Sequence, residues 1–178
     1  GFSGGNAFFR PFNNPTNYAN GVFDSTTGLV KFRNCCWFTN IEHGRRHQPL
    51  NLMTMADNLK FSKHKEIRNI GYSKYDNYDA IEVPFTDAIP SDYEGVMGVP
   101  ISFLEKYCPE QFEILGTSDN GIVADEYKIT PGLTQKFVDD YYCAGGKGSY
   151  KEGNPTAGLY KNGIATMVYK RIFIRKRV

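Results

Sequence analysis

The sequence lacks several features that would place it in common protein classes. No run of about 18 apolar residues is present, so it offers no candidate membrane-spanning helix. Residues 1–5 contain no initiator methionine, no basic stretch and no apolar stretch, which excludes a secretory signal at this end. We therefore expect no membrane association, and we expect that the chain begins inside a longer protein.

Cysteine and histidine are scarce and poorly spaced for metal binding. No CxxC pair occurs among Cys35, Cys36, Cys108 and Cys143, and His43, His47 and His64 do not complete a ligand set. We therefore predict no metal site. Adjacent cysteines in a strand-like aromatic run are more typical of free thiols than of disulfides, which points to a reducing compartment, the cytoplasm.

Common catalytic motifs are also missing. A phosphate-binding loop needs Lys-Ser or Lys-Thr directly after its second glycine, but Gly148 separates Lys147 from Ser149. Carboxylates between residues 76 and 92 could pair for acid–base work or hold a metal. Their surroundings favour turns and a strand edge instead; these residues are Asp76, Asp79, Glu82 and Asp92.

The composition is that of a folded globular protein. The chain has 178 residues, enough for one domain with a sizeable core, and its 40% hydrophobic and 22% charged content is ordinary. Net charge is only +2 but unevenly distributed. Residues 43–68 and 170–177 are basic, whereas carboxylates gather between residues 76 and 126.

Short segments of strand-like pattern dominate the chain. Strands are predicted near residues 7–10, 28–32, 34–40, 79–83 and 111–116. Residues 50–70 favour irregular structure with a short helix, and 99–107 and 134–142 favour short helices. At the end, residues 159–161, the Asn162-Gly163 turn and the run 166–174 predict a hairpin. The expected fold is α+β, mostly short β-strands with few short helices and a C-terminal β-hairpin.

Two basic segments suit nucleic-acid contacts. Arg45, Arg46 and His47 follow a predicted strand, where an arginine fork could meet a phosphate or a guanine edge. Lys63 and Lys65 form a second group. Each segment alone is better explained by a solvated turn or face, but the two together, near aromatic residues, favour nucleic-acid binding. Those are Tyr75 and Tyr78, as base-stacking or packing residues.

Three blocks resemble EcoRI-type adenine-specific DNA methyltransferases. The first is the Asn-Cys-Cys-Trp-Phe-Thr-Asn stretch from residue 34, extending to His43. The second runs from Tyr75 to Val83, resumes at Ile89 and continues to Gly116, and the third is the closing run 171–175. Residues 118–156 do not align and are predicted to be an insertion.

The resemblance implies an S-adenosylmethionine-dependent, adenine-N6 DNA methyltransferase of a restriction-modification or phage-like system. That family's Phe-x-Gly-x-Gly turn is not matched at residues 2–6, where Asn6 replaces the second spaced glycine. The amine-holding Asn/Asp-Pro-Pro-aromatic loop is also unmatched, because the Asn-Pro-Thr segments at 14–16 and 154–156 lack the second proline and the aromatic.

The chain is therefore expected to be one C-terminal target-recognition domain, residues 1–178, that acts on double-stranded DNA. The catalytic domain is expected upstream, so no catalytic or cofactor residue is assigned here. We expect no tight binding of S-adenosylmethionine by this chain. The alternative is a non-catalytic DNA- or protein-binding module that has kept the fold.

Overall fold

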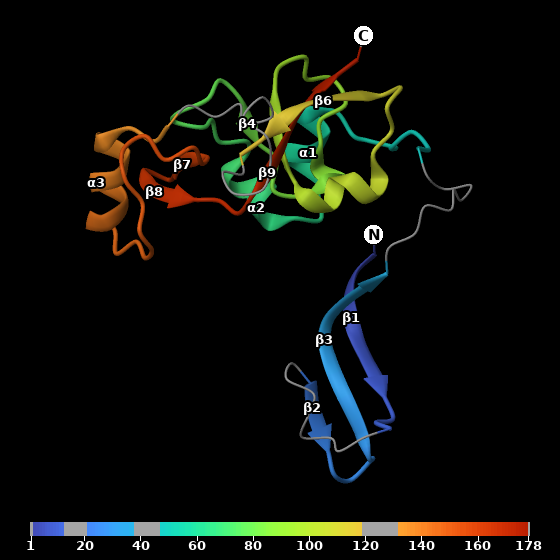
Figure 1. The fold of residues 1–178 in the computed structure, drawn as a ribbon. Coiled ribbons are helices and arrows are strands. Elements are labelled where there is room, and N and C mark those ends of the chain that lie inside the picture. The colour runs from blue at the N-terminus through green and yellow to red at the C-terminus, as the bar shows by residue number, and fades with distance from the viewer. Residues whose placement is uncertain (1, 13–20, 38–46, 119–131, 178) are drawn as a thin grey trace. The chain divides into compact units, whose positions relative to one another are not determined.

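The computed structural model describes residues 2–12, 21–37, 47–118 and 132–177 (Figure 1). The chain divides into two compact units, Gly1–Gly44 and Arg45–Val178, which are described separately. The mixture of short strands and few short helices confirms the predicted α+β class.

The first unit is a three-stranded antiparallel sheet in the order β1-β3-β2. Its strands are β1 (Phe2–Phe9), β2 (Gly21–Asp24) and β3 (Leu29–Trp37). The β2–β3 turn closes on Gly28, whose φ of 68° suits glycine and whose N–H donates to Asp24 O at 2.8 Å. The Asp24 carboxylate accepts hydrogen bonds from Thr27 Oγ1 at 2.8 Å and from Thr26 N at 2.9 Å. These hydrogen bonds lower the pKa of Asp24.

Among residues 6–12 and 21–32, the part of the first unit whose side chains are described, few side chains are buried. Val30 is fully enclosed, and Phe9 meets Phe32 edge to face at 5.8 Å between ring centroids. Several large apolar side chains are exposed: Phe8, Phe9, Phe12, Val22 and Phe23. Among the residues described here, this sheet is held mainly by its backbone ladder.

A four-stranded sheet, ordered β4-β5-β9-β6, forms the centre of the second unit (Figure 1). Its strands are β4 (Ile81–Glu82), β5 (Met97–Pro100), β6 (Phe112–Thr117) and β9 (Arg171–Lys176). β4 and β5 run parallel, whereas β9 pairs antiparallel with both β5 and β6. The last strand in the sequence therefore lies inside the sheet.

Side chains alternate across β9, so each face of the sheet has its own core. Ile172 and Ile174 join the larger cluster, which also holds Phe103 of the 3-10 helix η3 (Ile101–Lys106). Phe173 points into the opposite cluster with Tyr75 and Leu159. Ile172 and Ile174 therefore face one core, and Phe173 faces the other.

A helix and a hairpin form a third cluster. The hairpin joins β7 (Gly158–Lys161) to β8 (Ile164–Met167), and α3 (Gln135–Cys143) packs on it through Phe137 and Val138. Asn162 and Gly163, with φ of 51° and 78°, make the predicted Asn-Gly turn. The described part of the predicted insertion, residues 132–156, thus includes a helix that packs into this core.

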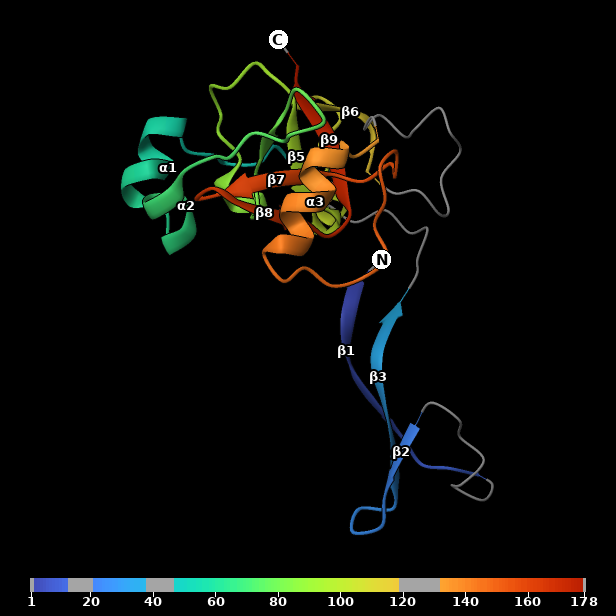
Figure 2. The same cartoon turned by 90° about the vertical axis from the view of Figure 1, so that its left-hand side faces the viewer.

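Two short helices precede the sheet, α1 (Met55–Phe61) and α2 (Lys65–Ile70). They lie side by side at one end of the second unit (Figure 2). Thr54 caps α1 by accepting the N–H of Asp57 at 3.1 Å. A third short element, η2 (Thr86–Ala88), follows β4. Of the helices in the described segments, none is long and apolar enough to cross a membrane.

Two strand predictions need correction. Residues 28–32 and 34–40 were predicted as separate strands, but Leu29–Trp37 is one continuous strand that pairs with both neighbours. The run 166–174 is not one hairpin strand: β8 ends at Met167, and the chain crosses to another sheet as β9. Alternation alone cannot show this crossing, because the pattern continues through the link.

Candidate functional site

Lys63 and His64 converge on one carboxylate at the surface. Lys63 Nζ lies 2.5 Å from Asp87 Oδ2, and His64 Nε2 lies 2.7 Å from Asp87 Oδ1. The His64 ring stacks on Phe85 at 3.6 Å between centroids. Burial alone would raise the pKa of Asp87, but the bonds from Lys63 and His64 outweigh it and lower that pKa. Lys63 remains 74% exposed, so its pair with Asp87 is weak and easily exchanged for another anion.

Exposed cationic residues occur in α1, in α2 and in the short link between them. Four of them together are here called the helix-pair surface: Lys60, Lys63, Lys65 and Arg68. Ile67 of α2 is fully buried on the other side and fixes which residues face outward. The Arg68 guanidinium also donates to the carbonyl of Ser62, at the end of α1.

The predicted basic segment at residues 45–47 is only partly described. His47 is exposed, and its Nδ1 lies 2.9 Å from the carbonyl oxygen of Tyr107, beside the Tyr107 ring. Arg45 and Arg46 lie outside the described residues. His47 contacts Tyr107 at the end of η3, whereas Lys63 contacts Asp87 in the segment after β4.

Tyr75 belongs to a buried polar network. Its hydroxyl donates a hydrogen bond to Glu82 Oε2. The guanidinium of Arg171, on β9, donates hydrogen bonds to the same carboxylate. Arg171 Nη2 lies 2.6 Å from Glu82 Oε1, and Arg171 Nε lies 3.0 Å from Oε2. Glu82 is 2% exposed and Tyr75 is 6% exposed. Tyr75 is therefore packed inside the second unit, and its predicted part in DNA binding stays a prediction.

The pKa shifts of Tyr75 and Arg171 agree with the hydrogen bonds that both donate to Glu82. Burial, followed by the charge of Glu82, raises the pKa of Tyr75 well above 10, so the phenol stays protonated and donates. Burial alone would lower the pKa of Arg171, but its bonds to Glu82 raise that pKa instead. A cation and a neutral donor thus compensate one buried carboxylate.

Tyr78 and Gly98 complete the packing around Tyr75. Tyr78 is half-buried with its ring 4.8 Å from that of Phe173, and burial raises the pKa of its hydroxyl. A side chain at position 98 would collide with the Tyr75 ring, so this β5 position requires glycine. The two tyrosines and β9 therefore form one packed unit.

The carboxylates considered for acid–base work do not gather. Asp76, Asp79 and Asp92 are exposed, and Asp92 accepts the N–H of Met55 at 2.7 Å. Glu82 lies on β4, an edge strand of the sheet, as predicted, but its side chain is buried and paired with Arg171 of β9. Within the described segments, no three His, Cys, Asp or Glu side chains form a metal-binding group. Two described cysteines, Cys108 and Cys143, are free thiols.

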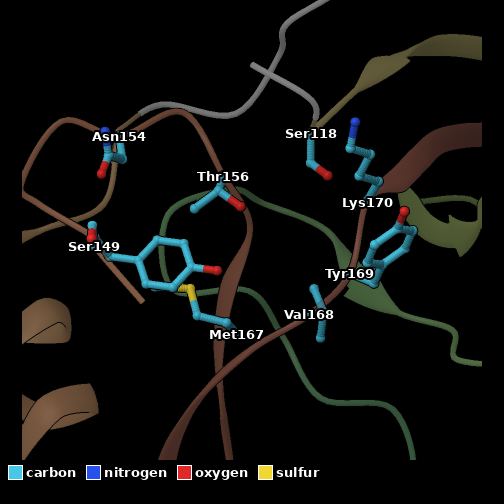
Figure 3. Close-up of a pocket in the computed structure, with 9 residues that line it drawn as sticks. Ser118, Ser149, Asn154, Thr156, Met167, Val168, Tyr169 and Lys170 are labelled. Atoms are coloured by element: carbon cyan, nitrogen blue, oxygen red, sulfur yellow. The ribbon is translucent and has the colours of Figure 1, made fainter. Parts of the chain in front are cut away.

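A cavity of about 440 Å³ opens between the hairpin and the end of β6 (Figure 3). Met167, Val168, Tyr169 and Lys170 line one side, and Ser118 stands near Lys170. The opposite side comes from the loop after α3. Its residues are Ser149, Tyr150, Asn154 and Thr156.

Sequence reasoning missed this cavity. The link residues Tyr169 and Lys170 were assigned to a continuous strand, where they would only have been surface positions. An exposed aromatic beside a lysine was the available signal, but the loop that faces them lies elsewhere in the sequence. Only the packing of α3 on the hairpin brings that loop to the cavity.

Comparison with known proteins gives one family. A family profile described as "Adenine-specific methyltransferase EcoRI" matches residues 1–177. Among curated proteins, the type II methyltransferase M.EcoRI of Escherichia coli is 46% identical over 87 residues, covering 49% of this chain and 24% of that protein. No solved structure matches.

Two mycoplasma proteins show similar relationships. The type II methyltransferase M.MgeORF184P of Mycoplasma genitalium is 42% identical over 85 residues, which is 48% of this chain and 24% of that protein. M.MpnI of Mycoplasma pneumoniae, also a type II methyltransferase, is 40% identical over 79 residues. These are 44% of this chain and 22% of that protein. The matched region spans about a quarter of the length of each relative.

Proposed function

Because this chain belongs to the EcoRI family of adenine-specific methyltransferases, we propose that it is the DNA-recognition part of a site-specific, adenine-N6 DNA methyltransferase. The observation that carries this proposal is the helix-pair surface, where all four cationic residues are exposed. Lysines and arginines on one face are the usual means of neutralising DNA phosphates. The parent protein uses S-adenosylmethionine, bound outside this chain, in a restriction-modification or phage-like system.

The proposed roles differ between the candidate residues. Lys63 and Lys65 contact phosphates, because an ammonium group acts as a point charge without reading sequence. Arg45 and Arg46, with His47, enter a groove, where a guanidinium can fork onto a guanine edge. Tyr75 and Tyr78 support the DNA-binding residues indirectly by packing against β9.

We propose that the protein works in the cytoplasm, where double-stranded DNA is its partner in bacteria. Two free thiols in the described residues are compatible with a reducing compartment. Loss of affinity at high salt separates this proposal from its alternative. DNA binding releases counterions and weakens steeply with salt, whereas an apolar protein partner would bind with little salt dependence.

The test measures DNA affinity by fluorescence anisotropy across a salt series. Lys63→Ala and Lys65→Ala should each reduce the slope of log affinity against log salt by about 1, with equal effects on all sequences. Lys147→Ala is the matched control, since this exposed lysine lies in the loop after α3. Equal slopes for all three variants and the unsubstituted chain would contradict the placement of DNA on the helix-pair surface.

A second arm concerns sequence reading. Arg45→Ala or Arg46→Ala should cost about 1–3 kcal/mol of binding and relax preference at one base pair, if the guanidinium reads a guanine. Methylation rates of the full enzyme on the true site and on single-base variants measure this preference. A uniform loss on all sequences would instead assign both arginines to phosphates.

A further inference from the structure

We propose that Asp87 competes with DNA phosphates for the ammonium group of Lys63, and so limits how tightly the helix-pair surface holds DNA of any sequence. The inference rests on the proposed DNA-binding function and concerns the regulation of that surface. It involves no contact with a base, because an ammonium group that moves between a carboxylate and a phosphate reads no sequence.

A fixed backbone presents Asp87 at the surface. Its neighbours in η2, Thr86 and Ala88, are buried, whereas the Asp87 side chain is 42% exposed. The N–H of Ala88 donates to the carbonyl of Phe85 at 2.9 Å, and the carbonyl of Ala88 accepts the hydroxyl of Tyr72 at 2.6 Å. The Asp87 carboxylate is therefore held at a defined place beside the link between α1 and α2.

The two partners of Asp87 differ in their freedom to leave it. His64 contacts Asp87 Oδ1 at 2.7 Å through Nε2, and its ring is 20% exposed and stacked on Phe85. Lys63 Nζ lies 2.5 Å from Asp87 Oδ2, but the Lys63 side chain is 74% exposed on a flexible four-carbon stem. An incoming anion should therefore take Lys63 and leave His64 on Asp87.

The carboxylate of Asp87 can stand in for a phosphate. Both groups accept charge-assisted hydrogen bonds from an ammonium group through anionic oxygens. Burial raises the pKa of Asp87, but the bonds from Lys63 and His64 outweigh burial and lower that pKa. The group is therefore ionised at neutral pH and is available as a competitor whenever DNA is absent.

The strength of the ion pair sets the size of the effect. An exposed pair of this kind changes an equilibrium by roughly 1.5- to 5-fold, and this factor is lost each time a phosphate takes Lys63. The loss is the same on every sequence, because phosphates are alike. Sites that are not the target far outnumber the target in a genome, so a weaker phosphate contact shortens the time spent on them.

The decisive variant is Asp87→Asn. Asparagine keeps the shape of the side chain and an oxygen that can accept a hydrogen bond from His64, but it has no charge to compete with DNA. Fluorescence anisotropy with a labelled duplex of about 20 base pairs should show a rise in affinity of roughly two- to fivefold at low salt, equal on two unrelated sequences. Structural damage cannot imitate this result, because a distorted surface binds less tightly.

Two further variants separate competition from a general effect of charge. Asp57→Asn makes the same change in net charge in the same helix pair, at an exposed residue whose carboxylate accepts Thr54 Oγ1 at 2.8 Å. Its gain in affinity should be clearly smaller than that of Asp87→Asn. In a Lys63→Ala background the excess should vanish, because the carboxylate then has no ammonium group to withhold from DNA.

The outcomes distinguish this inference from the proposed function. Equal gains for Asp87→Asn and Asp57→Asn, or a gain at Asp87 that persists without Lys63, reject the competition and assign the effect to net charge. Weaker binding by Asp87→Asn together with a lower free energy of unfolding in urea makes the residue structural, which also rejects it. Both results leave salt-dependent DNA binding intact. If the unsubstituted protein binds no duplex at all, the proposed function itself fails.

Discussion

The two units of this chain are stabilised by different means. In Gly1–Gly44 the strands form a backbone ladder, and among the side chains described, those of residues 6–12 and 21–32, Val30 is the fully buried one. Arg45–Val178 holds three apolar clusters and a buried carboxylate that is paired and hydrogen-bonded. A sheet with few buried side chains has a small free energy of unfolding. In a packed core with a buried ion pair, by contrast, the loss of one charged partner lowers that free energy strongly.

The largest test of this difference is Arg171→Met. It leaves the Glu82 carboxylate buried without its cation, and we expect a loss of about 3–5 kcal/mol in the stability of the second unit. Hydrogen exchange read by mass spectrometry should show faster exchange across residues 47–118 and 132–177, with residues 2–12 and 21–37 unchanged. The double variant E82Q with R171M should recover part of the loss. Uniform faster exchange in both units would contradict separate stabilisation.

The corresponding test in the first unit is Val30→Ala. Removing its buried methyl groups should cost about 2 kcal/mol, because the lost apolar burial and the cavity add together. Exchange should accelerate in residues 21–37 but not in β5 or β9. Val22→Ala is the control, since that side chain is exposed on the same sheet. An equal effect of the two substitutions would mean that Val30 is not the anchor of this unit.

Each unit has a turn with a glycine in the left-handed conformation, which allows the same substitution to be compared in both. Gly28 and Gly163 both have positive φ, 68° and 78°, one in each unit. Gly28→Ala and Gly163→Ala should each cost about 1–2 kcal/mol, because a Cβ disfavours this conformation equally in both turns. The first substitution should increase exchange throughout the small sheet, whereas the second should act only near the hairpin. If both substitutions accelerate hydrogen exchange over the whole of their units, the two units do not differ in stability as proposed.

The smallest expected effect is a pH dependence confined to the second unit. The folded pKa of Tyr75 is raised above its unfolded value of about 10, so this stability is fully present below pH 10 and declines as pH rises beyond it. Between pH 10 and pH 11 about 1 kcal/mol of stability is lost, because the unfolded phenol ionises while the folded one stays protonated. Tyr75→Phe should flatten the stability curve between pH 10 and 11, measured by urea unfolding. An unchanged slope would show that Tyr75 does not titrate differently on unfolding.

Local patterns predicted the elements that depend on neighbouring residues. The Asn162-Gly163 turn, the helix near 134–142 and the strand near 111–116 were all predicted, because turn chemistry and period act within a few positions. Residues 50–70 were predicted as irregular with a short helix, yet they form α1 and α2. Their weak periodicity reflects short helices whose stability comes from packing.

Features formed by distant residues were beyond the sequence patterns. Arg171 meets Glu82 across 89 positions, and no local signal distinguishes this pair from solvated charges. Tyr75 was considered for base stacking because aromatic residues near basic ones suggest it, but the same ring is needed to satisfy Glu82. The candidate contacts Lys63 and Lys65 lie exposed as expected, and their role in DNA binding stays a prediction.

The position of β9 has a consequence for synthesis on the ribosome. This strand is made last among the described elements, yet β5 and β6 are not neighbours and meet only through it. The sheet cannot close until residues 171–176 leave the exit tunnel. Before then, Phe112, Met97 and Val99 have no central partner, so the nascent chain carries exposed apolar surface until β9 emerges. Chaperone engagement at β5 and β6 should accordingly persist until that point.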